Sequence, residues 1–257
     1  MIYEQDNIQL VQQISDSSIR SSNSGILIGG VDEAGRGSII GPLVVAGISI
    51  RKSKISKLRQ IGVKDSKMLT PKARGNLFRL VMDMADSLCI YIINCTIVDN
   101  NVFLNRLNKL EAETMASVIN NIQADKVYID SCDVNPCRFK DYIESRLVLS
   151  SSSSSKPKLY SLHHADSLNI VVSAASIIAK IVRDKQIQEI RNTHHNIGSG
   201  YPSDWKTMLF IRGWVSKYKC APHFARKSWS PLKKMLEEVT QYNNNNNNNT
   251  NINQALE

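Results

Sequence analysis

The sequence predicts an α/β fold, with a mixed central sheet flanked by helices and a helical C-terminal portion. Apolar segments rich in β-branched residues alternate with longer segments whose apolar residues recur at helical spacing. The resulting order is strand, strand, helix, strand, helix, strand, strand, and then helices to the end of the chain. Two strands in immediate succession favour antiparallel pairing. The helices between the later strands favour a sheet whose faces are covered by helices. Together these observations predict a mixed sheet.

Five segments have the composition of strands, and glycines separate the first two from each other. The predicted strands cover Ile26–Asp32, Gly41–Ile50, Ser87–Ile97, Lys126–Cys132 and Lys158–Asp166. Residues 1–24 precede them and are polar and rich in serine and asparagine. We therefore expect these N-terminal residues to form a loose extension or an added helix.

Three further segments have helical periodicity. The first begins with a capping threonine, Thr70, and has Pro71 at its first helical position. Its stripe positions are Leu77, Leu80, Val81 and Met84, and those of the second helix are Phe103, Leu107, Leu110, Thr114 and Val118. The third helix covers Ser173–Arg191 and has an apolar stripe beside a stripe of hydroxyl and basic side chains.

Composition narrows the class of protein. The 257-residue chain carries nine more basic than acidic side chains, which favours a polyanionic partner such as nucleic acid or an anionic membrane surface. No apolar run approaches the roughly 18 residues of a membrane span, and the N-terminus lacks the order of a signal peptide. We therefore expect a cytoplasmic protein that does not enter the membrane. The five cysteines include no Cys-x-x-Cys pair, so neither a disulfide framework nor a zinc ribbon is expected.

Acidic residues stand where three of the predicted strands end. They are Asp32, Asp130 and Asp166, and Glu33 follows Asp32 directly. Side chains at the carboxyl ends of neighbouring strands meet at one edge of an α/β sheet, so these carboxylates are expected to converge. Because strand side chains alternate between faces, Glu33 can join them only if Ala34-Gly35 ends the strand. Clustered carboxylates repel one another without a cation, and all-oxygen ligands favour magnesium or manganese.

Each of these aspartates alone has a simpler interpretation, as a strand-end cap or a surface charge. Five ordered blocks between Ile26 and Trp229 change that assessment. They read GVDEAGRG with GPLVVAG, VKDSKMLTPKAR, YIDS, HAD with VVSAASIIAKIVRD, and GSGYPSD. In this order they resemble ribonuclease HII, the type 2 ribonuclease H, in its archaeal form.

The resemblance implies a ribonuclease H-like fold with a catalytic core over residues 25–200. A helical substrate-binding region would follow over residues 201–240. Composition, not the resemblance, predicts a disordered Asn-rich tail over residues 241–257, because its asparagine run cannot bury enough apolar surface. The implied enzyme is an endoribonuclease that hydrolyses the RNA strand of RNA-DNA hybrids and incises at ribonucleotides embedded in duplex DNA. Its products would carry 5′-phosphate and 3′-hydroxyl ends, and it would act as a monomer.

The family's metal ligands map onto Asp32, Glu33, Asp130 and Asp166. These four would hold two divalent ions, Mn²⁺ or Mg²⁺, in a two-metal mechanism. The serine run at residues 150–155 lengthens the gap before Asp166, so Asp184 remains an alternative fourth ligand.

The resemblance also implies substrate contacts. Gly35, Arg36 and Gly37 would bind the 2′-hydroxyl that distinguishes RNA from DNA, with Arg36 on the neighbouring phosphate. Tyr201 would be a stacking platform for the sugar at the RNA-DNA junction. Phosphate contacts are expected from Lys64, Lys67, Ser173, Lys180 and Arg183, and contacts to the DNA strand from Arg212, Lys217, Lys219, Arg226 and Lys227. Simpler interpretations remain for each, namely solvated basic groups, a helix cap at Ser173 and a core or turn residue at Tyr201.

Two other hypotheses are a catalytically inactive hybrid-binding subunit and a type 3 ribonuclease H. The intact acidic set argues against the first. The second would need a substantial N-terminal domain, for which 24 polar residues are too few. Ser38 and Trp205 stand where the family often has proline, and neither replacement removes a functional group.

Overall fold

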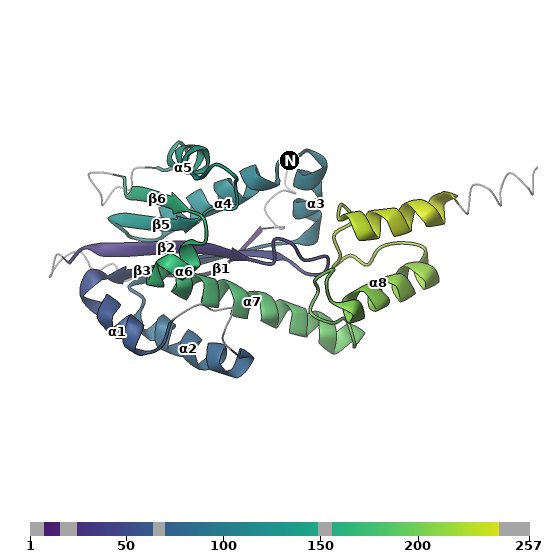
Figure 1. Ribbon diagram of the computed structural model, residues 1–257, viewed down its shortest axis with the longest axis horizontal. Helices are drawn as coiled ribbons and strands as arrows, with labels where there is room; N and C mark the ends of the chain where they lie inside the picture. The colour runs from purple at the N-terminus through teal and green to yellow at the C-terminus, as the bar shows by residue number, and fades with distance from the viewer. Residues whose placement is uncertain (1–7, 16–24, 64–69, 149–155, 242–257) are drawn as a thin grey trace, which may run out of the picture.

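A computed structural model describes residues 8–15, 25–63, 70–148 and 156–241. Its centre is a six-stranded sheet with the strand order β1-β4-β3-β2-β5-β6 (Figure 1). The strands are β1 (Ile8–Ser15), β2 (Leu27–Ala34), β3 (Leu43–Arg51), β4 (Ser87–Ile93), β5 (Lys126–Asp130) and β6 (Lys158–Leu162). Strands β1, β4, β3 and β2 pair antiparallel in turn, whereas β2, β5 and β6 are parallel. The predicted mixed sheet is confirmed.

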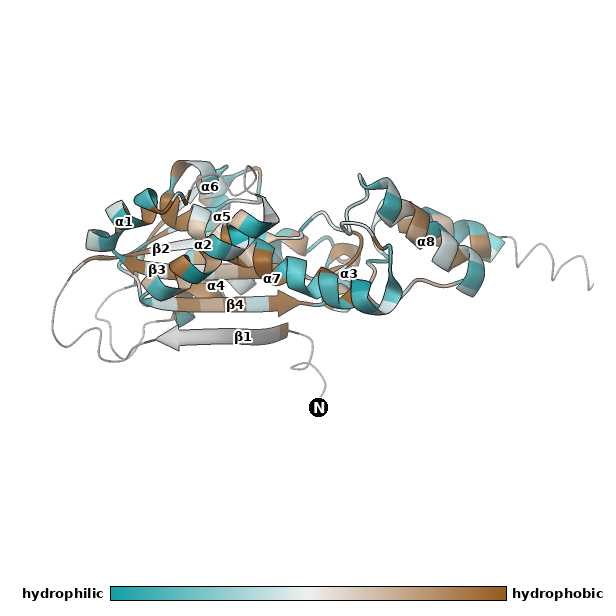
Figure 2. Cartoon of the chain, turned by 90° about the horizontal axis from the view of Figure 1, so that it is seen from below, coloured by the Kyte–Doolittle hydropathy of each residue, from teal (hydrophilic) through white to brown (hydrophobic). Residues whose placement is uncertain are grey.

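Helices cover both faces of this sheet. They are α1 (Ile55–Gln60), α2 (Pro71–Met84), α3 (Cys95–Phe103), α4 (Leu107–Asn121), α5 (Pro136–Glu144), α6 (Ala165–Leu168), α7 (Ile170–His194) and α8 (Trp205–Tyr218), with a 3-10 turn at Lys52–Lys54 and a last helix over residues 230–241. Figure 1 shows α1, α2 and α7 on one face and α3, α4 and α5 on the other. Each face has its own cluster of buried apolar residues. Strand β4 is coloured almost entirely as hydrophobic in Figure 2, as expected for a strand covered on both sides.

The approach of α7 to β2 is set by a glycine. A Cβ atom at Gly30 would lie 2.4 Å from the carbonyl carbon of Val171, so no larger residue fits without moving the helix. Glycine in a strand interior often marks such a close backbone approach. As a result the first turns of α7 lie directly against the strand that carries Asp32.

Strand β1 is a finding that the sequence pattern does not predict. Residues 8–15 pair with β4 at the edge of the sheet, where a loose extension or a helix is expected. The pairing shifts register between Leu10 and Gln12. An edge strand needs backbone partners on one side only, so a polar segment can form one without a clear alternating pattern.

Several predicted elements differ in their bounds, and β6 ends at Leu162 rather than at Asp166. Strand β4 ends at Ile93 because Asn94 caps α3, accepting a hydrogen bond from the Ile97 backbone N–H at 3.0 Å. The single predicted helix with a stripe from Phe103 to Val118 is two helices, α3 and α4. The chain turns between them at Asn105, whose φ is +54°, so Phe103 lies outside the core. Helix α2 begins as predicted, with Thr70 accepting a hydrogen bond from Ala73, but Leu80 on its predicted stripe is exposed.

The C-terminal helices pack around a third apolar cluster. Residues of α8 and of the segment 224–239 meet Ile39 and Ile40, which follow β2, and Ile187 near the end of α7. The C-terminal part of the chain therefore rests on the loop between β2 and β3. No helix in the described ranges is long and apolar enough to cross a bilayer.

Candidate active site

Three carboxylates, two on neighbouring parallel strands and one just after the next strand, meet at one edge of the sheet. Asp32 lies in β2, Asp130 is the last residue of β5, and Asp166 lies in α6, shortly after β6. One oxygen from each lies within 4.8 Å of the other two. Asp32 and Asp166 are buried and Asp130 is partly buried. Residues more than 130 positions apart in the sequence thus form one acidic group.

Backbone groups and a neighbouring helix orient these acids. The Ala165 N–H donates to Asp130 Oδ1 at 2.9 Å, which joins β5 to the turn that carries Asp166. The Glu33 N–H donates to Asp32 Oδ1 at 2.7 Å, and the Ser176 side chain on α7 also hydrogen-bonds Asp32. The close approach of α7 at Gly30 brings Ser176 within reach.

Burial and repulsion from its neighbours disfavour negative charge on Asp32. Burial is the largest cause that raises the pKa of Asp32, from 3.8 to about 7, and the charges of Asp130 and Asp166 raise it further. The hydrogen bonds from Ser176 and Glu33 lower it in part. A divalent cation would offset the repulsion, and oxygen ligands of this kind suit Mg²⁺ or Mn²⁺. The donor set therefore fits the predicted metal type.

Glu33 is not part of the acidic group of three. The strand ends at Ala34, as expected, but Glu33 still lies within β2, so the alternation of side chains turns it away from the face of Asp32. Glu33 shares the face of Val31, toward α4, where burial and the charges of Asp32 and Glu111 raise its pKa well above the usual value. Its Oε2 atom is buried without a hydrogen-bond partner. This oxygen therefore has lone pairs available to a ligand.

The loop after β2 is a tight turn closed by serine. Gly35 has φ of +86°, and its carbonyl oxygen accepts hydrogen bonds from the backbone N–H and the hydroxyl of Ser38 at 3.2 and 2.8 Å. Ser38, which stands where proline is common, therefore contributes a hydrogen bond that proline lacks. Gly37 is exposed, and a Cβ atom there would meet nothing within 4 Å.

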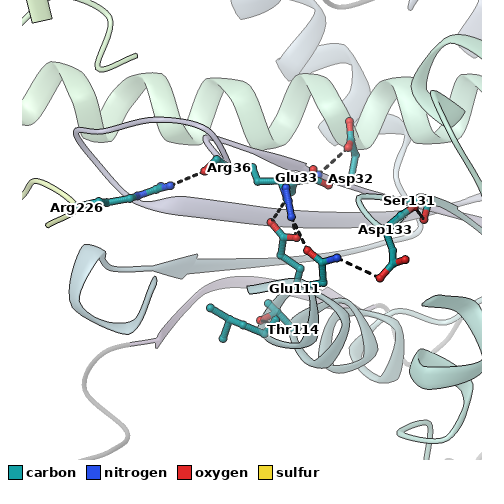
Figure 3. A network of polar contacts seen from close by, with 10 residues as sticks. Asp32, Glu33, Arg36, Glu111, Thr114, Ser131, Asp133 and Arg226 are labelled. Atoms are coloured by element: carbon teal, nitrogen blue, oxygen red, sulfur yellow. Dashed lines mark hydrogen bonds and ion pairs between the residues drawn. The ribbon is translucent and has the colours of Figure 1, made fainter. Parts of the chain in front are cut away.

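Arg36 is held by helix α4. Its Nε donates to both carboxylate oxygens of Glu111, at 2.9 and 3.0 Å, and its Nη2 donates to Asn108 Oδ1 at 2.6 Å. Glu111 is fully buried, whereas 34% of the Arg36 side chain remains exposed. In Figure 3, Asp32 points toward the green helix α7, and Arg36 points to Glu111 on the other side of β2. Helix α4 therefore holds the guanidinium, which is not freely solvated, and its contact with a phosphate stays a prediction.

Arg226 also supports the loop after β2. It is fully buried and donates to the carbonyl oxygen of Arg36 at 2.7 Å and to that of Gly41 at 3.0 and 3.2 Å (Figure 3). The expectation that Arg226 contacts a DNA strand is therefore wrong. The several N–H donors of a guanidinium can hydrogen-bond two buried carbonyl groups of one loop, whereas carbonyl groups at the surface can bond to water.

Tyr201 lies beside the loop after β2. The carbonyl oxygen of Gly200 accepts hydrogen bonds from the backbone N–H groups of Ile39 and Ile40 at 2.8 and 3.0 Å. The guanidinium of Arg183 lies 4.3 Å from the centre of the Tyr201 ring and donates to the Ser199 carbonyl at 2.8 Å. Arg183 is buried and so is a support of Tyr201 rather than an exposed phosphate contact.

The remaining predicted phosphate contacts and the alternative metal ligand lie in different parts of the structure. Ser173 is buried on α7, its Oγ has no hydrogen-bond partner, and it lines a cavity of about 260 Å³ with Asp166 and Arg59. Lys180 is partly buried on the same helix. Lys64 and Lys67 lie outside the described residues. Asp184, the alternative ligand, pairs with Arg74 and Arg183 instead, so it is not in the acidic group.

The sequence alone does not indicate that three other residues belong to the site. Glu111, Ser176 and Arg226 touch the loop after β2 or Asp32 itself, yet they lie on α4, on α7 and after α8. Ser176 has a weak signal, its place in the hydroxyl stripe of the predicted third helix. Glu111 and Arg226 have none, because their partners are 75 and 190 positions away.

Comparisons with known proteins agree with this site. The family model of ribonuclease HII matches residues 29–232. Ribonuclease HII of Cenarchaeum symbiosum is 45% identical over 208 residues, which cover 81% of this chain and 97% of that protein. The crystal structure of ribonuclease H2 from Pyrococcus horikoshii OT3 aligns with a TM-score of 0.77 at 37% identity, covering 84% of this chain and 99% of that one. A chain in the PCNA–RNase HII complex from Archaeoglobus fulgidus aligns with a TM-score of 0.72 at 31% identity, covering 80% and 96%.

These matches confirm the ribonuclease H-like fold and the resemblance in the sequence motifs. They span most of this chain and nearly all of each relative. The chain therefore belongs to the ribonuclease HII family and is a ribonuclease H hydrolase.

Proposed function

We propose that this ribonuclease H is an endonuclease that cuts RNA in RNA-DNA hybrids and incises duplex DNA at single embedded ribonucleotides. The cut would leave 5′-phosphate and 3′-hydroxyl ends. The observation that carries the proposal is the convergence of Asp32, Asp130 and Asp166 within 4.8 Å, beside an exposed glycine turn. We propose further that the enzyme acts as a monomer in the cytoplasm.

Asp32, Asp130 and Asp166 would hold a divalent ion, Mg²⁺ or Mn²⁺. Glu33, with its buried and unpartnered Oε2, would contribute from the opposite face of β2 to a second ion. When bound, a pair of such ions supplies an activated water and stabilises the leaving 3′ oxygen. The protein's own part is to keep the carboxylates in place through the hydrogen bonds from Ala165, the Glu33 backbone and Ser176.

The turn from Gly35 to Gly37 would read the 2′-hydroxyl of the ribonucleotide. Open space at Gly37 allows a sugar to approach the backbone, and peptide groups can hydrogen-bond a 2′-hydroxyl. Arg36 would act through α4, by fixing the turn, because Glu111 and Asn108 engage its guanidinium. Tyr201 has one ring face against Arg183, so its other face would stack on the sugar at the junction.

The remaining contacts would bind phosphates of the cleaved strand. The Ser173 hydroxyl lies in a cavity with Asp166 and has no internal partner, as a substrate contact requires. Lys180 lies two turns further along α7. Lys64 and Lys67 stay predictions from the sequence.

The test is cleavage of a duplex DNA that contains one ribonucleotide, with end-group analysis of the products. We expect a 5′-phosphate and a 3′-hydroxyl with Mg²⁺ or Mn²⁺ present. Asp130→Asn should remove most cleavage, and Asp141→Asn on the exposed side of α5 is its matched control. Normal cleavage by the Asp130→Asn protein would refute the site, and no cleavage by the unaltered protein with either metal would favour the inactive hybrid-binding subunit.

A further inference from the structure

A polar cavity lies beside Arg36, between α3, α4 and α5, and contains none of the three carboxylates of the acidic group. Its volume is about 570 Å³. The walls combine three cations, two amides and an aromatic ring. They come from Arg36, Lys109, Arg138, Asn105, Asn108 and Tyr142, with Asp133 and apolar residues of α3, α4 and α5 below them.

The charges of this cavity do not cancel. Arg36 is paired with Glu111, and Arg138 with Asp133 at 2.5 Å. Lys109 adds a third cation, whose Nζ lies 5.9 Å from the centre of the Tyr142 ring. Within the described ranges, Asp133 is the single carboxylate that lines the cavity, so the lining keeps a net positive charge even after Glu111 is counted against Arg36.

The polar groups of the cavity are also oriented in advance. Asn108 donates to Asp133 at 3.1 Å and accepts from Arg36, and Asp133 accepts from the Asn135 backbone N–H at 2.9 Å. These bonds lower the pKa of Asp133 despite its burial, so it stays ionised and holds Arg138 in place. The Arg138 side chain is still 65% exposed, which leaves most of its guanidinium facing solvent.

Helix α4 begins at this cavity. Leu107, Asn108 and Lys109 of its first turn line the wall, and no side chain caps the turn. The positive end of the helix dipole adds to the attraction for an anion that the two basic side chains create.

We infer that this cavity is a subsite for one phosphodiester group of the nucleic-acid duplex, with Lys109 and Arg138 as its contacts. The inference rests on the proposed function, since a duplex that reaches the Gly35–Gly37 turn passes next to Arg36, which lines the cavity. A bound phosphate would be coupled to that turn through Asn108, which contacts both Arg36 and Asp133. The subsite would therefore help to place the ribonucleotide as well as to bind the duplex.

The experiment measures duplex binding in an Asp130→Asn background, by fluorescence anisotropy at several salt concentrations. Each phosphate contact contributes about 0.9 to the slope of log affinity against log salt concentration. Relative to 1 M salt, one contact therefore increases the affinity at 0.1 M salt by about eightfold. Lys109→Gln should lose about eightfold at 0.1 M salt and lower the slope by about 0.9. The matched control is Lys140→Gln, a lysine on α5 that pairs with Asp141 and does not line the cavity.

A second measurement identifies the phosphate. Single phosphates of each strand are replaced in turn by neutral methylphosphonates, and binding is compared between the Asp130→Asn protein and the same protein with Lys109→Gln. We expect one position whose replacement weakens the first protein about eightfold and leaves the second unchanged. Equal losses from Lys109→Gln and Lys140→Gln, or no coupled position on either strand, would overturn the subsite.

These outcomes are separate from those of the proposed function. Cleavage of the ribonucleotide duplex by the unaltered protein tests the acidic group, because Lys109 lies on α4 and lines a cavity that contains none of its carboxylates. Thermal unfolding of both lysine variants checks that each remains folded.

Discussion

Replacing Asp32 by asparagine should make the metal-free protein more stable at neutral pH, although it should abolish cleavage. The folded protein holds the pKa of Asp32 at about 7, against 3.8 as the reference for an unfolded chain. One pKa unit is equivalent to about 1.4 kcal/mol, so the ionised carboxylate costs the folded state at most about 4 kcal/mol. Asparagine keeps an oxygen that accepts from the Glu33 N–H and removes the charge.

The sign of this effect depends on pH. Below pH 3.8 the carboxyl is protonated in both states and contributes nothing. Between 3.8 and about 7 the unfolded chain ionises while the folded protein does not, so stability falls as pH rises. Above pH 7 the full cost is present. The gain from Asp32→Asn should therefore be near zero at pH 4 and reach its maximum at pH 8.

The assay is urea unfolding followed by circular dichroism in EDTA at both pH values. Asp133→Asn is the contrasting control, because hydrogen bonds from Asn135, Asn108 and Arg138 outweigh burial and lower the pKa of Asp133. That variant should lose stability at pH 8. Added Mn²⁺ at about 100 times its Kd should stabilise the unaltered protein by about 2.7 kcal/mol and the Asp32→Asn protein by less. An Asp32→Asn protein that is less stable than the unaltered one at pH 8 without metal would refute the reasoning.

Three further predictions concern the packing of α7, the cap of α2 and the support of Tyr201. Gly30→Ala should cost at least about 2 kcal/mol in urea unfolding, because its Cβ would lie 2.4 Å from the Val171 backbone; an unchanged midpoint would mean that α7 can move away freely. Thr70→Ala should cost about 1 kcal/mol in the same assay through the lost helix cap, with catalysis unchanged. Arg183→Lys should raise KM for the single-ribonucleotide duplex more than it lowers kcat, because lysine cannot stack flat on Tyr201; a change in kcat alone would contradict a positioning role.

Local patterns in the sequence predict much of the fold. The apolar, β-branched runs of β2 and β3, the cap and proline at the start of α2, and the stripe of α7 all concern residues within a few positions of one another. Such patterns depend on backbone geometry that neighbouring residues set. Where an element owes its existence to a distant partner, as β1 does to β4, the local pattern is too weak to predict it.

The sequence by itself determines which chemistry the chain carries, because Asp32, Asp130 and Asp166 follow apolar strand segments and parallel strands end at one edge. Tertiary structure alone decides which charges are buried and what they contact. Glu33 faces α4 because β2 includes it and ends only at Ala34, and Arg226 is buried because loops 190 positions apart enclose it. The physical reason is that a buried charged group loses its hydrating water and needs hydrogen bonds or ion pairs in its place. The residues that provide them can come from any part of the chain.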